Sequence, residues 1–261
     1  MSAPIMEVAN LSKSFGALTV LSEISVSVSE REIVAVLGPS GCGKSTFLHI
    51  IAGLLCPDAG DVSLNGVSIT GKPGHVSYQQ QKDLLLPWKT VVENVILPLR
   101  IGGATRREAL REVLPLMERF GLSGFENVYP GTLSGGMRQR AALMRTYLVT
   151  RNLMLLDEPF GALDSMTRSD MHEWLLSVIR ETRSSALIVT HDIDEAILLA
   201  DRVLVLTSRP ARVHREVIIG LKRPRNRHSL LSNEALELRG LLLSSLDEAY
   251  RPAEKSVDLV Y

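Results

Sequence analysis

The sequence predicts an α/β protein built on a mostly parallel sheet, with a group of helices inserted into that core. An unbroken apolar run of strand length occurs at 33–37, and two later runs at 153–156 and 186–190 each end in a polar cluster. Runs of this kind suit strands that are buried on both faces of a sheet. A helix-like stretch at 171–182 separates the last two runs, and this alternation is typical of parallel strands.

The first part of the core can be read in order along the chain. Short β-like runs occur at 5–8 and 21–28, ahead of the strand at 33–37. A glycine-rich loop at 38–43 follows this strand directly. Residues 46–55 then predict a helix, which ends where glycine and proline appear. Strand, loop and helix therefore succeed one another without a break.

The middle of the chain predicts a helical lobe. Residues 105–120 carry apolar side chains at helical spacing, and 135–149 also look helical. We therefore expect a helical subdomain at about 84–150, inserted into a main domain that spans 1–230. A C-terminal helical tail is expected at 231–261.

Composition excludes several classes of function. Lys plus Arg and Asp plus Glu both total 29, so we expect no nucleic-acid partner bound through bulk positive charge. Cys42 and Cys56 lack metal-ligand spacing, which predicts free thiols in a reducing compartment. No stretch approaches the ~20 apolar residues of a membrane span, so we expect a cytosolic chain that meets a membrane only through a partner. Arginines and lysines crowd together at 209–227, which predicts a loosely attached tail or a solvated surface.

The glycine-rich loop fits the pattern G-x-x-x-x-G-K-[ST], which binds nucleotide phosphates. With the threonine that follows it, the loop consists of Gly38, Pro39, Ser40, Gly41, Cys42, Gly43, Lys44, Ser45 and Thr46. Its glycines let backbone N–H groups face a phosphate, and the helix N-terminus adds positive potential. Lys44 would place a charge on the outer phosphates, and Ser45 would bind Mg²⁺. We also expect a thiol reagent to inactivate the protein through Cys42.

Two carboxylates follow the second apolar run, at the edge where parallel sheets bind ligands. Asp157 would hold the metal ion directly or through water. Glu158 would act as the general base that polarises the attacking water. Acidic residues are common at strand ends, and it is the phosphate loop upstream that favours the catalytic interpretation.

Three further segments carry a family resemblance. Residues 133–140 read LSGGMRQR, 155–164 read LLDEPFGALD and 189–192 read VTHD. With the phosphate loop, they make the chain resemble the ATP-binding subunits of ABC transporters from about residue 6 to 210. The resemblance implies a P-loop NTPase core of the ABC type, an N-terminal antiparallel β subdomain and an inserted helical subdomain. It also implies ATP and Mg²⁺ as cofactors.

The resemblance assigns roles to residues in these segments. Ser134, Gly135 and Gly136 open a helix and form the signature that binds the nucleotide held by a second subunit. A head-to-tail homodimer is therefore implied. Met137 replaces the glutamine that is commonest in the family, and we infer no loss of activity from it. His191 is implied to contact the γ-phosphate and to orient Glu158 and the water.

Two assignments by resemblance leave alternatives open. Gln79, Gln80 and Gln81 are candidates for the glutamine that senses Mg²⁺ and the attacking water. We choose Gln81, since it stands at the family's distance from the Leu-Leu-Pro-Trp segment, with Gln80 as the second choice. Phe15 stands where the family places an aromatic ring that stacks on adenine, and its alternative is a core phenylalanine.

The resemblance also implies partners. The apolar segment 84–88 would form part of a groove for a helix of an integral membrane permease, and a charge at Leu85 would break that contact. Trp88 could instead be a core residue. The motifs are similar to those of the importer branch for nitrate, sulfonates, taurine and pyrimidine-type precursors. This implies a periplasmic or extracellular solute-binding protein and a peripheral place at the cytoplasmic face of the membrane.

Two rival functions belong to other classes. A soluble ABC-type ATPase that acts without a permease usually has two such domains or long coiled coils, and this sequence shows neither. A degenerate nucleotide-binding regulator would lack Lys44, Glu158 or His191, and all three are present. The sequence therefore favours an active ATPase subunit of a transporter, and no residue selects its solute.

Overall fold

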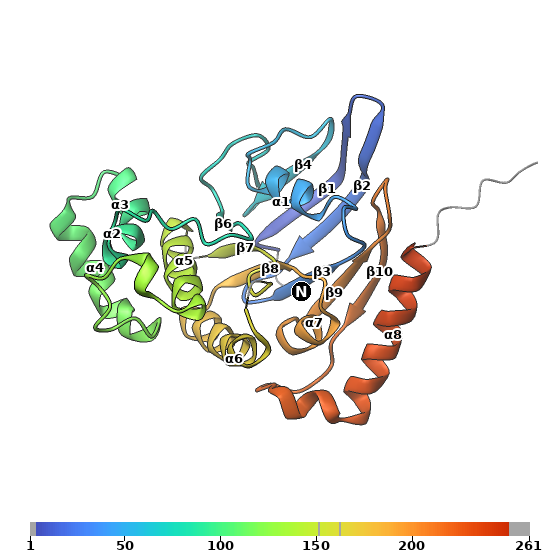
Figure 1. Ribbon diagram of the computed structural model, residues 1–261. Helices are drawn as coiled ribbons and strands as arrows, with labels where there is room; N and C mark the ends of the chain where they lie inside the picture. The colour runs from blue at the N-terminus through green and yellow to red at the C-terminus, as the bar shows by residue number, and fades with distance from the viewer. Residues whose placement is uncertain (1–3, 151, 162, 251–261) are drawn as a thin grey trace, which may run out of the picture.

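The computed structural model describes residues 4–150, 152–161 and 163–250. Position 162 of the motif at 155–164 lies outside the described residues, as do residues 251–261 of the predicted C-terminal tail. The described chain forms an α/β core with a smaller helical lobe beside it, which is the green region at the left of Figure 1.

A six-stranded sheet forms the centre of the core. Its strands are β3 (Ile33–Leu37), β6 (Ser77–Gln79), β7 (Leu153–Asp157), β8 (Ser185–Val189), β9 (Arg202–Leu206) and β10 (Val213–Ile218). Their order is β10-β9-β3-β8-β7-β6, and all neighbours are parallel except β10, which pairs with β9 in the antiparallel sense. Every residue of β3, β7 and β8 is buried, as their apolar runs predict. The mostly parallel sheet is therefore confirmed.

A second sheet of four antiparallel strands covers one side of the core. It contains β1 (Met6–Phe15), β2 (Leu18–Val28), β4 (Ala59–Leu64) and β5 (Val67–Ser68), in the order β2-β1-β4-β5. Helix α1 (Lys44–Ile51) buries Phe47, Leu48 and Ile51 in the same hydrophobic cluster as Val34 and Val36 of β3. This packing holds the start of α1 at the end of β3.

The helical lobe consists of three short helices and two long ones among the described residues. They are α2 (Val91–Val95), α3 (Leu97–Ile101), α4 (Arg106–Arg119), η1 (Pro130–Thr132) and α5 (Gly135–Thr150). Thr90 with Glu93, and Thr105 with Glu108, form capping boxes at α2 and α4, each worth about 1 kcal/mol. Helix α5 packs against α2 and α3 on one side and against β6 and β7 on the other. It therefore ties the lobe to the core.

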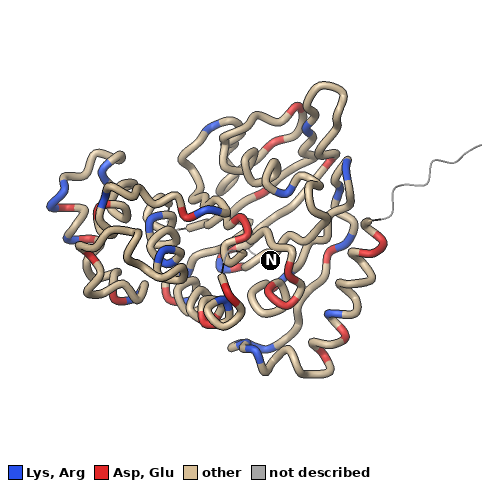
Figure 2. The backbone as a smooth tube through the Cα atoms, viewed as in Figure 1, with Lys and Arg blue, Asp and Glu red and all other residues tan. Residues whose placement is uncertain are grey.

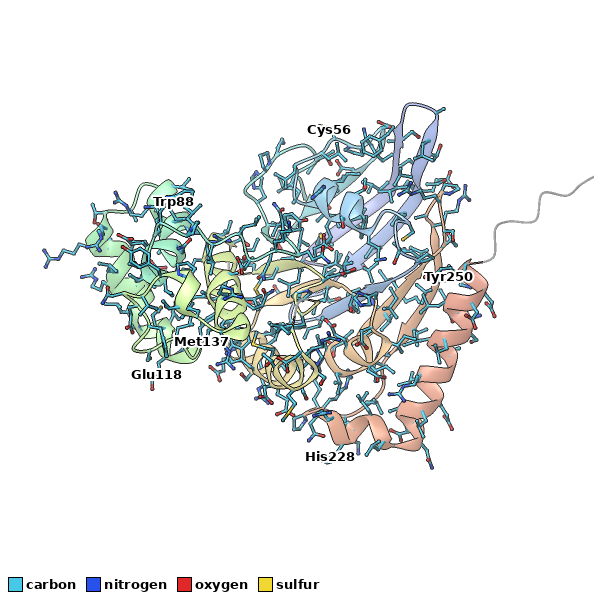
Figure 3. The ribbon with its side chains drawn as sticks, viewed as in Figure 1. Cys56, Trp88, Glu118, Met137, His228 and Tyr250 are labelled. Carbon is cyan, nitrogen blue, oxygen red and sulfur yellow. The ribbon has the colours of Figure 1, made fainter. Side chains whose placement is uncertain are left out.

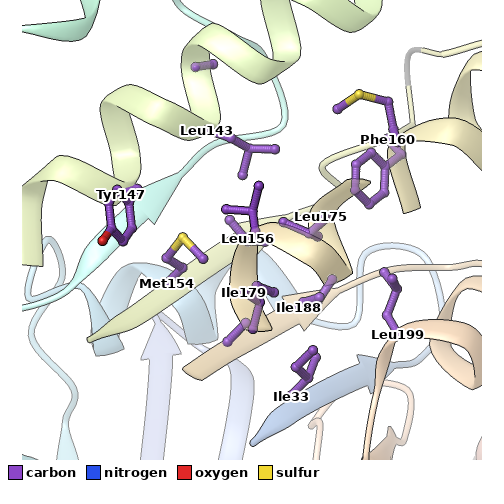
Figure 4. Packing of buried hydrophobic residues seen from close by; sticks show 14 of the residues in the cluster. Ile33, Leu143, Tyr147, Met154, Leu156, Phe160, Leu175, Ile179, Ile188 and Leu199 are labelled. Carbon is purple, nitrogen blue, oxygen red and sulfur yellow. The ribbon is translucent and has the colours of Figure 1, made fainter. Parts of the chain in front are cut away.

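The other face of the central sheet is covered by α5, α6 (Ser165–Thr182) and α7 (Ile193–Leu199). Figure 4 shows Leu143 of α5 beside Leu156 of β7, and Leu175 of α6 close to both. Ile188 of β8 and Phe160, which follows β7, belong to the same buried cluster. The start of the loop after β7 and part of β8 thus pack in the same hydrophobic cluster.

The C-terminal region is docked on the core, so the expectation of a loosely attached tail is wrong for the described residues. The alternative of a solvated surface holds for most of the basic residues at 209–227, which are exposed. Strand β10 joins the central sheet, and α8 (Asn233–Tyr250), which follows η2 (Arg227–Leu231), buries Ala235, Leu242 and Ala249. Arg225 is 4% exposed. Its guanidinium donates hydrogen bonds to the carbonyl oxygens of Ile197, Ala200, Ile219 and Leu221. Burial lowers the pKa of Arg225 to about 10.

Charges of both signs are spread over the surface. Figure 2 shows Lys and Arg interspersed with Asp and Glu along the helical lobe, the core and the C-terminal helix. This arrangement agrees with equal totals of 29 basic and 29 acidic residues. In this view no element presents a long stripe of one sign.

Candidate nucleotide and magnesium site

The phosphate loop lies between the end of β3 and the start of α1. Lys44 is 7% exposed, and its Nζ donates hydrogen bonds to the carbonyl oxygens of Gly38 (2.7 Å) and Pro39 (2.9 Å). No side chain caps the N-terminus of α1 at Gly43. The first N–H groups of a helix lack intrahelical partners, so this end offers donors to an anion beside the Lys44 charge.

Close packing explains two glycines of the site. Gly43 has a φ of 126°, and a Cβ there would lie 2.7 Å from Val20 Cγ1. A Cβ on Gly136, near the start of α5, would lie 2.9 Å from Thr167 Cγ2 of α6. A side chain at either position would push the neighbouring element away, so both helix starts depend on glycine.

Asp157 ends β7 and is 7% exposed. Burial raises the pKa of its carboxyl, the adjacent Glu158 charge adds to the rise, and a side-chain hydrogen bond with Ser45 opposes it. Tyr78 Oη also donates to Asp157 Oδ2 at 3.5 Å. A carboxylate and a hydroxyl thus meet at the phosphate loop, and these oxygen donors fit Mg²⁺, which is usually held by one or two protein groups together with phosphate.

Glu158 is the point where three segments meet. Gln81 Nε2 donates to Glu158 Oε2 at 2.9 Å, and His191 Nδ1 lies 3.4 Å from the same oxygen. The Glu158 N–H donates to the carbonyl of Val189 at 2.9 Å. Its φ of 44° is left-handed, a costly conformation for a residue other than glycine and one often found at functional sites. Glu158 directly follows β7 and is hydrogen-bonded to the last residue of β8, so these two strands fix the direction of its side chain.

The three consecutive glutamines occupy different environments. Gln79 is 3% exposed in β6, and its amide atoms have no hydrogen-bond partner among the described residues. Gln80 is exposed and lies just beyond the strand. Gln81 is the one that contacts Glu158. The geometry thus supports the choice of Gln81, whose role stays a prediction.

The signature residues lie in the helical lobe, at the start of α5. Ser134 Oγ accepts a hydrogen bond from the Met137 N–H at 3.3 Å. Arg138 donates to the Leu133 carbonyl at 2.8 Å, which steadies the turn before the helix. Among the described residues, no hydrogen bond or ion pair joins Ser134, Gly135 or Gly136 to the phosphate loop. The start of α5 and the phosphate loop thus share no such bond among the described residues, and anion binding at each stays a prediction.

Phe15 ends β1 with its side chain 50% exposed, so the alternative of a core phenylalanine is wrong. Lys13 Nζ lies 5.5 Å from the ring centroid. Because the ring is open to solvent, a planar group can reach one of its faces. Its predicted contact with adenine stays a prediction.

Sequence reasoning missed three arginines that support the site. Arg145 donates to the carbonyls of Asp83 (2.6 Å) and Leu84 (2.8 Å), just after Gln81. Arg168 donates to the Leu163 carbonyl at 3.0 Å, lies 3.6 Å from Asp192, and so links the segments after Glu158 and His191. Arg209 Nε donates to the Gly41 carbonyl. Apart from the Arg168–Leu163 bond, these contacts join residues far apart in the sequence, and no local pattern signals them.

Some residues of the segment at 84–88 are buried in the core and others are exposed at the surface. Leu85 is 8% exposed and belongs to the main hydrophobic cluster, so it is wrong as a docking residue. Leu84 is 49% exposed and Trp88 is 70% exposed (Figure 3), so the alternative of Trp88 as a core residue is also wrong. The buried Asn94 holds the segment through hydrogen bonds with the carbonyls of Leu86 and Lys89. Trp88 is therefore displayed on a fixed loop.

Comparison with known proteins places these features in a family. A family model described as ABC transporter matches residues 21–161. The chain is 46% identical over 198 residues to the formylaminopyrimidine import ATP-binding protein of Halalkalibacterium halodurans, covering 76% of this chain and 77% of the relative. It is 40% identical over 209 residues to the taurine import ATP-binding protein of Yersinia pestis, with coverage of 80% and 82%.

A solved structure supports the same family. The dimeric ATP-binding cassette MJ0796, in a post-hydrolysis state bound to ADP and Pi, matches with a TM-score of 0.70 at 29% identity, over 83% of this chain and 100% of that chain. The chain therefore belongs to the ABC transporter family. It is an ATP-binding subunit and an ATPase with the fold of an ABC cassette. The resemblance to the taurine and pyrimidine importer branch is confirmed by the relatives.

The two thiols differ in accessibility, and this difference changes the expectation that a thiol reagent inactivates the protein through Cys42. Cys42 is 2% exposed, and burial raises the pKa of its thiol, whereas Cys56 is exposed (Figure 3). A thiol reagent should therefore label Cys56 first, with little loss of ATPase activity. Mass spectrometry of labelled peptides checks this, with Cys56→Ser as the control. Rapid inactivation of Cys56→Ser with label on Cys42 would contradict it.

Proposed function

We propose that this chain hydrolyses Mg-ATP as one half of a head-to-tail homodimer and thereby drives a membrane importer for a small solute. The observation that carries the proposal is the meeting of Gln81 and His191 on one oxygen of Glu158, whose neighbour Asp157 shares a hydrogen bond with Ser45 of the phosphate loop. Ser134 to Gly136 share no hydrogen bond or ion pair with this loop among the described residues of one chain. A second subunit would supply them, closing one ATP between a phosphate loop and a signature.

In the proposed reaction the chain positions groups and neutralises charge, which is where most catalysis of phosphoryl transfer arises. Glu158 accepts the proton of the attacking water. Gln81 and His191 orient Glu158 and the water, and His191 also donates to the γ-phosphate. Lys44 and the first N–H groups of α1 hold the outer phosphates. Ser45, Asp157 and Gln81 would hold Mg²⁺, which offsets phosphate charge when bound.

The partners proposed are two integral membrane permease subunits and a solute-binding protein outside the cell. No helix among the described residues is both long and apolar enough to cross a bilayer. We place the subunit at the cytoplasmic face of the membrane, bound to the permease. Two relatives are import proteins for formylaminopyrimidine and for taurine, which supports a small solute such as a sulfonate, nitrate or a pyrimidine precursor.

Co-expression with a candidate membrane permease of the importer type tests the proposal. The two should purify together, and vesicles that hold the complex should take up solute only with Mg-ATP inside and the solute-binding protein outside. The rival is a soluble ABC-type ATPase that works without a permease. ATPase activity that neither binds the permease nor responds to solute would favour that rival.

Trp88→Asp is expected to uncouple transport from hydrolysis. The side chain is 70% exposed, so folding and basal ATPase activity of the isolated subunit should be unchanged. Placing an unpaired charge in an apolar contact should cost several kcal/mol of docking. Permease binding and solute-stimulated ATPase should therefore be lost. Ile101→Asp, also exposed in the helical lobe, is the matched control. Normal uptake by Trp88→Asp vesicles would refute the docking surface.

A further inference from the structure

A cavity of about 820 Å³ lies at the edge of the central sheet opposite the nucleotide site. Ile33 begins β3, Ser184 precedes β8 and Asp201 precedes β9, and all three line this cavity. Residues assigned to the nucleotide follow the other ends of β3 and β8, at 38–46 and at His191. Small-molecule sites usually measure about 300–1,000 Å³, so the cavity has the size of a ligand site.

The floor of the cavity is apolar and firmly built. Ile33 and Ile179 are 3% and 4% exposed, and Leu176 and Pro224 also line the space. Arg225 also lines the cavity, and its guanidinium is committed to backbone carbonyls. An apolar ligand group in the cavity would therefore contact packed apolar side chains. It would not break the hydrogen bonds of Arg225.

The rim carries guanidinium groups that are not used by the fold. Arg31, Arg180 and Arg183 are exposed, and within the described residues their side chains have no ion pair or hydrogen bond. By contrast, Arg223 is paired with Asp201 at 2.7 Å. Arg180 and Arg183 stand at the end of α6 and reach the same cavity. A planar guanidinium fork matches the oxygens of a carboxylate or sulfonate.

Acidic side chains at the rim limit which anions fit. Glu32 is neutralised by Arg202 at 2.9 Å, whereas Glu30 and Glu173 have no ion pair among the described residues. Arg31, Arg180 and Arg183 therefore outnumber these two carboxylates, and Arg225 in the lining adds a positive charge that no carboxylate of the described residues pairs. The lining favours an anion, and a singly charged one is favoured over a polyanion because both glutamates would repel the polyanion more strongly.

We propose that this cavity binds a small organic anion with one carboxylate or sulfonate and an apolar body. The charged group pairs with Arg180 and Arg183, with Arg31 at the rim, and the apolar body lies on Ile33, Leu176 and Ile179. Because the cavity is at the far edge of the sheet, this ligand and ATP bind at the same time.

The test uses anilinonaphthalene sulfonate, a singly charged fluorescent sulfonate, with the full chain in saturating Mg-ADP so that the nucleotide site is filled. Dissociation constants are measured for wild type, for Arg180→Gln/Arg183→Gln and for Ser177→Phe, which fills the cavity without changing charge. Arg107→Gln/Arg111→Gln removes two exposed arginines from α4 as the matched control. Naphthalene sulfonate and pyrophosphate serve as competitors.

Both cavity variants should raise the dissociation constant at least tenfold, and the α4 control should stay within twofold of wild type. Naphthalene sulfonate should displace the probe at lower concentration than pyrophosphate does. Equal affinity in wild type and both cavity variants would overturn the proposal, as would the absence of saturable binding to wild type. Stronger displacement by pyrophosphate would also overturn it, because the site would then prefer a polyanion.

Discussion

Replacing Glu158 with Gln should lower the rate of ATP hydrolysis by about 10²–10⁴, the usual contribution of a general base. The amide can still accept a hydrogen bond from Gln81 Nε2, which lies 2.9 Å from the carboxylate oxygen, but it cannot take a proton from water. ATP binding should therefore remain. Phosphate release and nucleotide affinity, measured on the same purified protein, separate the two effects.

Glu181→Gln is the control for this variant, because it removes an exposed carboxylate from α6 away from the nucleotide. It should hydrolyse ATP at the wild-type rate. If Glu158→Gln kept more than a tenth of wild-type turnover, Glu158 would not be the general base. The convergence of Gln81 and His191 on its carboxylate would then need another explanation.

Replacing Lys44 with Ala should lower ATPase activity by at least about 10², the typical effect of removing one preorganised donor from a transition state. The buried ammonium lies 2.7 Å from the Gly38 carbonyl and 2.9 Å from the Pro39 carbonyl, within the loop that is proposed to hold the phosphates. Its loss also removes a charge that binds the ground state, so nucleotide affinity should fall as well. Titration with a fluorescent ATP analogue measures that fall.

Lys72→Ala serves as the control, since this lysine is exposed and its Nζ contacts only the Ser68 carbonyl among the described residues. Melting curves with and without Mg-ATP show whether Lys44→Ala is folded. Turnover close to wild type in folded Lys44→Ala would contradict the assignment of the phosphate loop.

Much of the core could be predicted because each of its parts is encoded by one short segment of the sequence. Strands β3, β7 and β8 are continuous apolar runs buried on both faces, so composition alone identifies them. The phosphate loop was visible for the same reason, since its glycines, Lys44 and Ser45 lie within one short stretch. In the structure β3, β8 and β7 are parallel neighbours, as the predicted α/β class with a mostly parallel sheet requires.

The parts that were missed depend on contacts between distant residues. Arg225 looks like one more surface arginine in the sequence, yet four carbonyls brought together by folding surround its guanidinium. Leu85 and Trp88 both look apolar, and only the path of the loop held by Asn94 decides that one is buried and the other exposed. Cys42 was expected to react, but packing beneath the loop covers it.

The mass of Glu158→Gln in solution tests the head-to-tail site most directly. Sedimentation equilibrium in saturating Mg-ATP should give twice the chain mass of 28.7 kDa, and the mass without nucleotide should be that of one chain. Adding Ser134→Arg, which blocks the signature without touching the phosphate loop, should return the protein to monomer although ATP still binds. A Glu158→Gln protein that stays monomeric in saturating Mg-ATP, or a dimer that Ser134→Arg leaves intact, would contradict the shared nucleotide site.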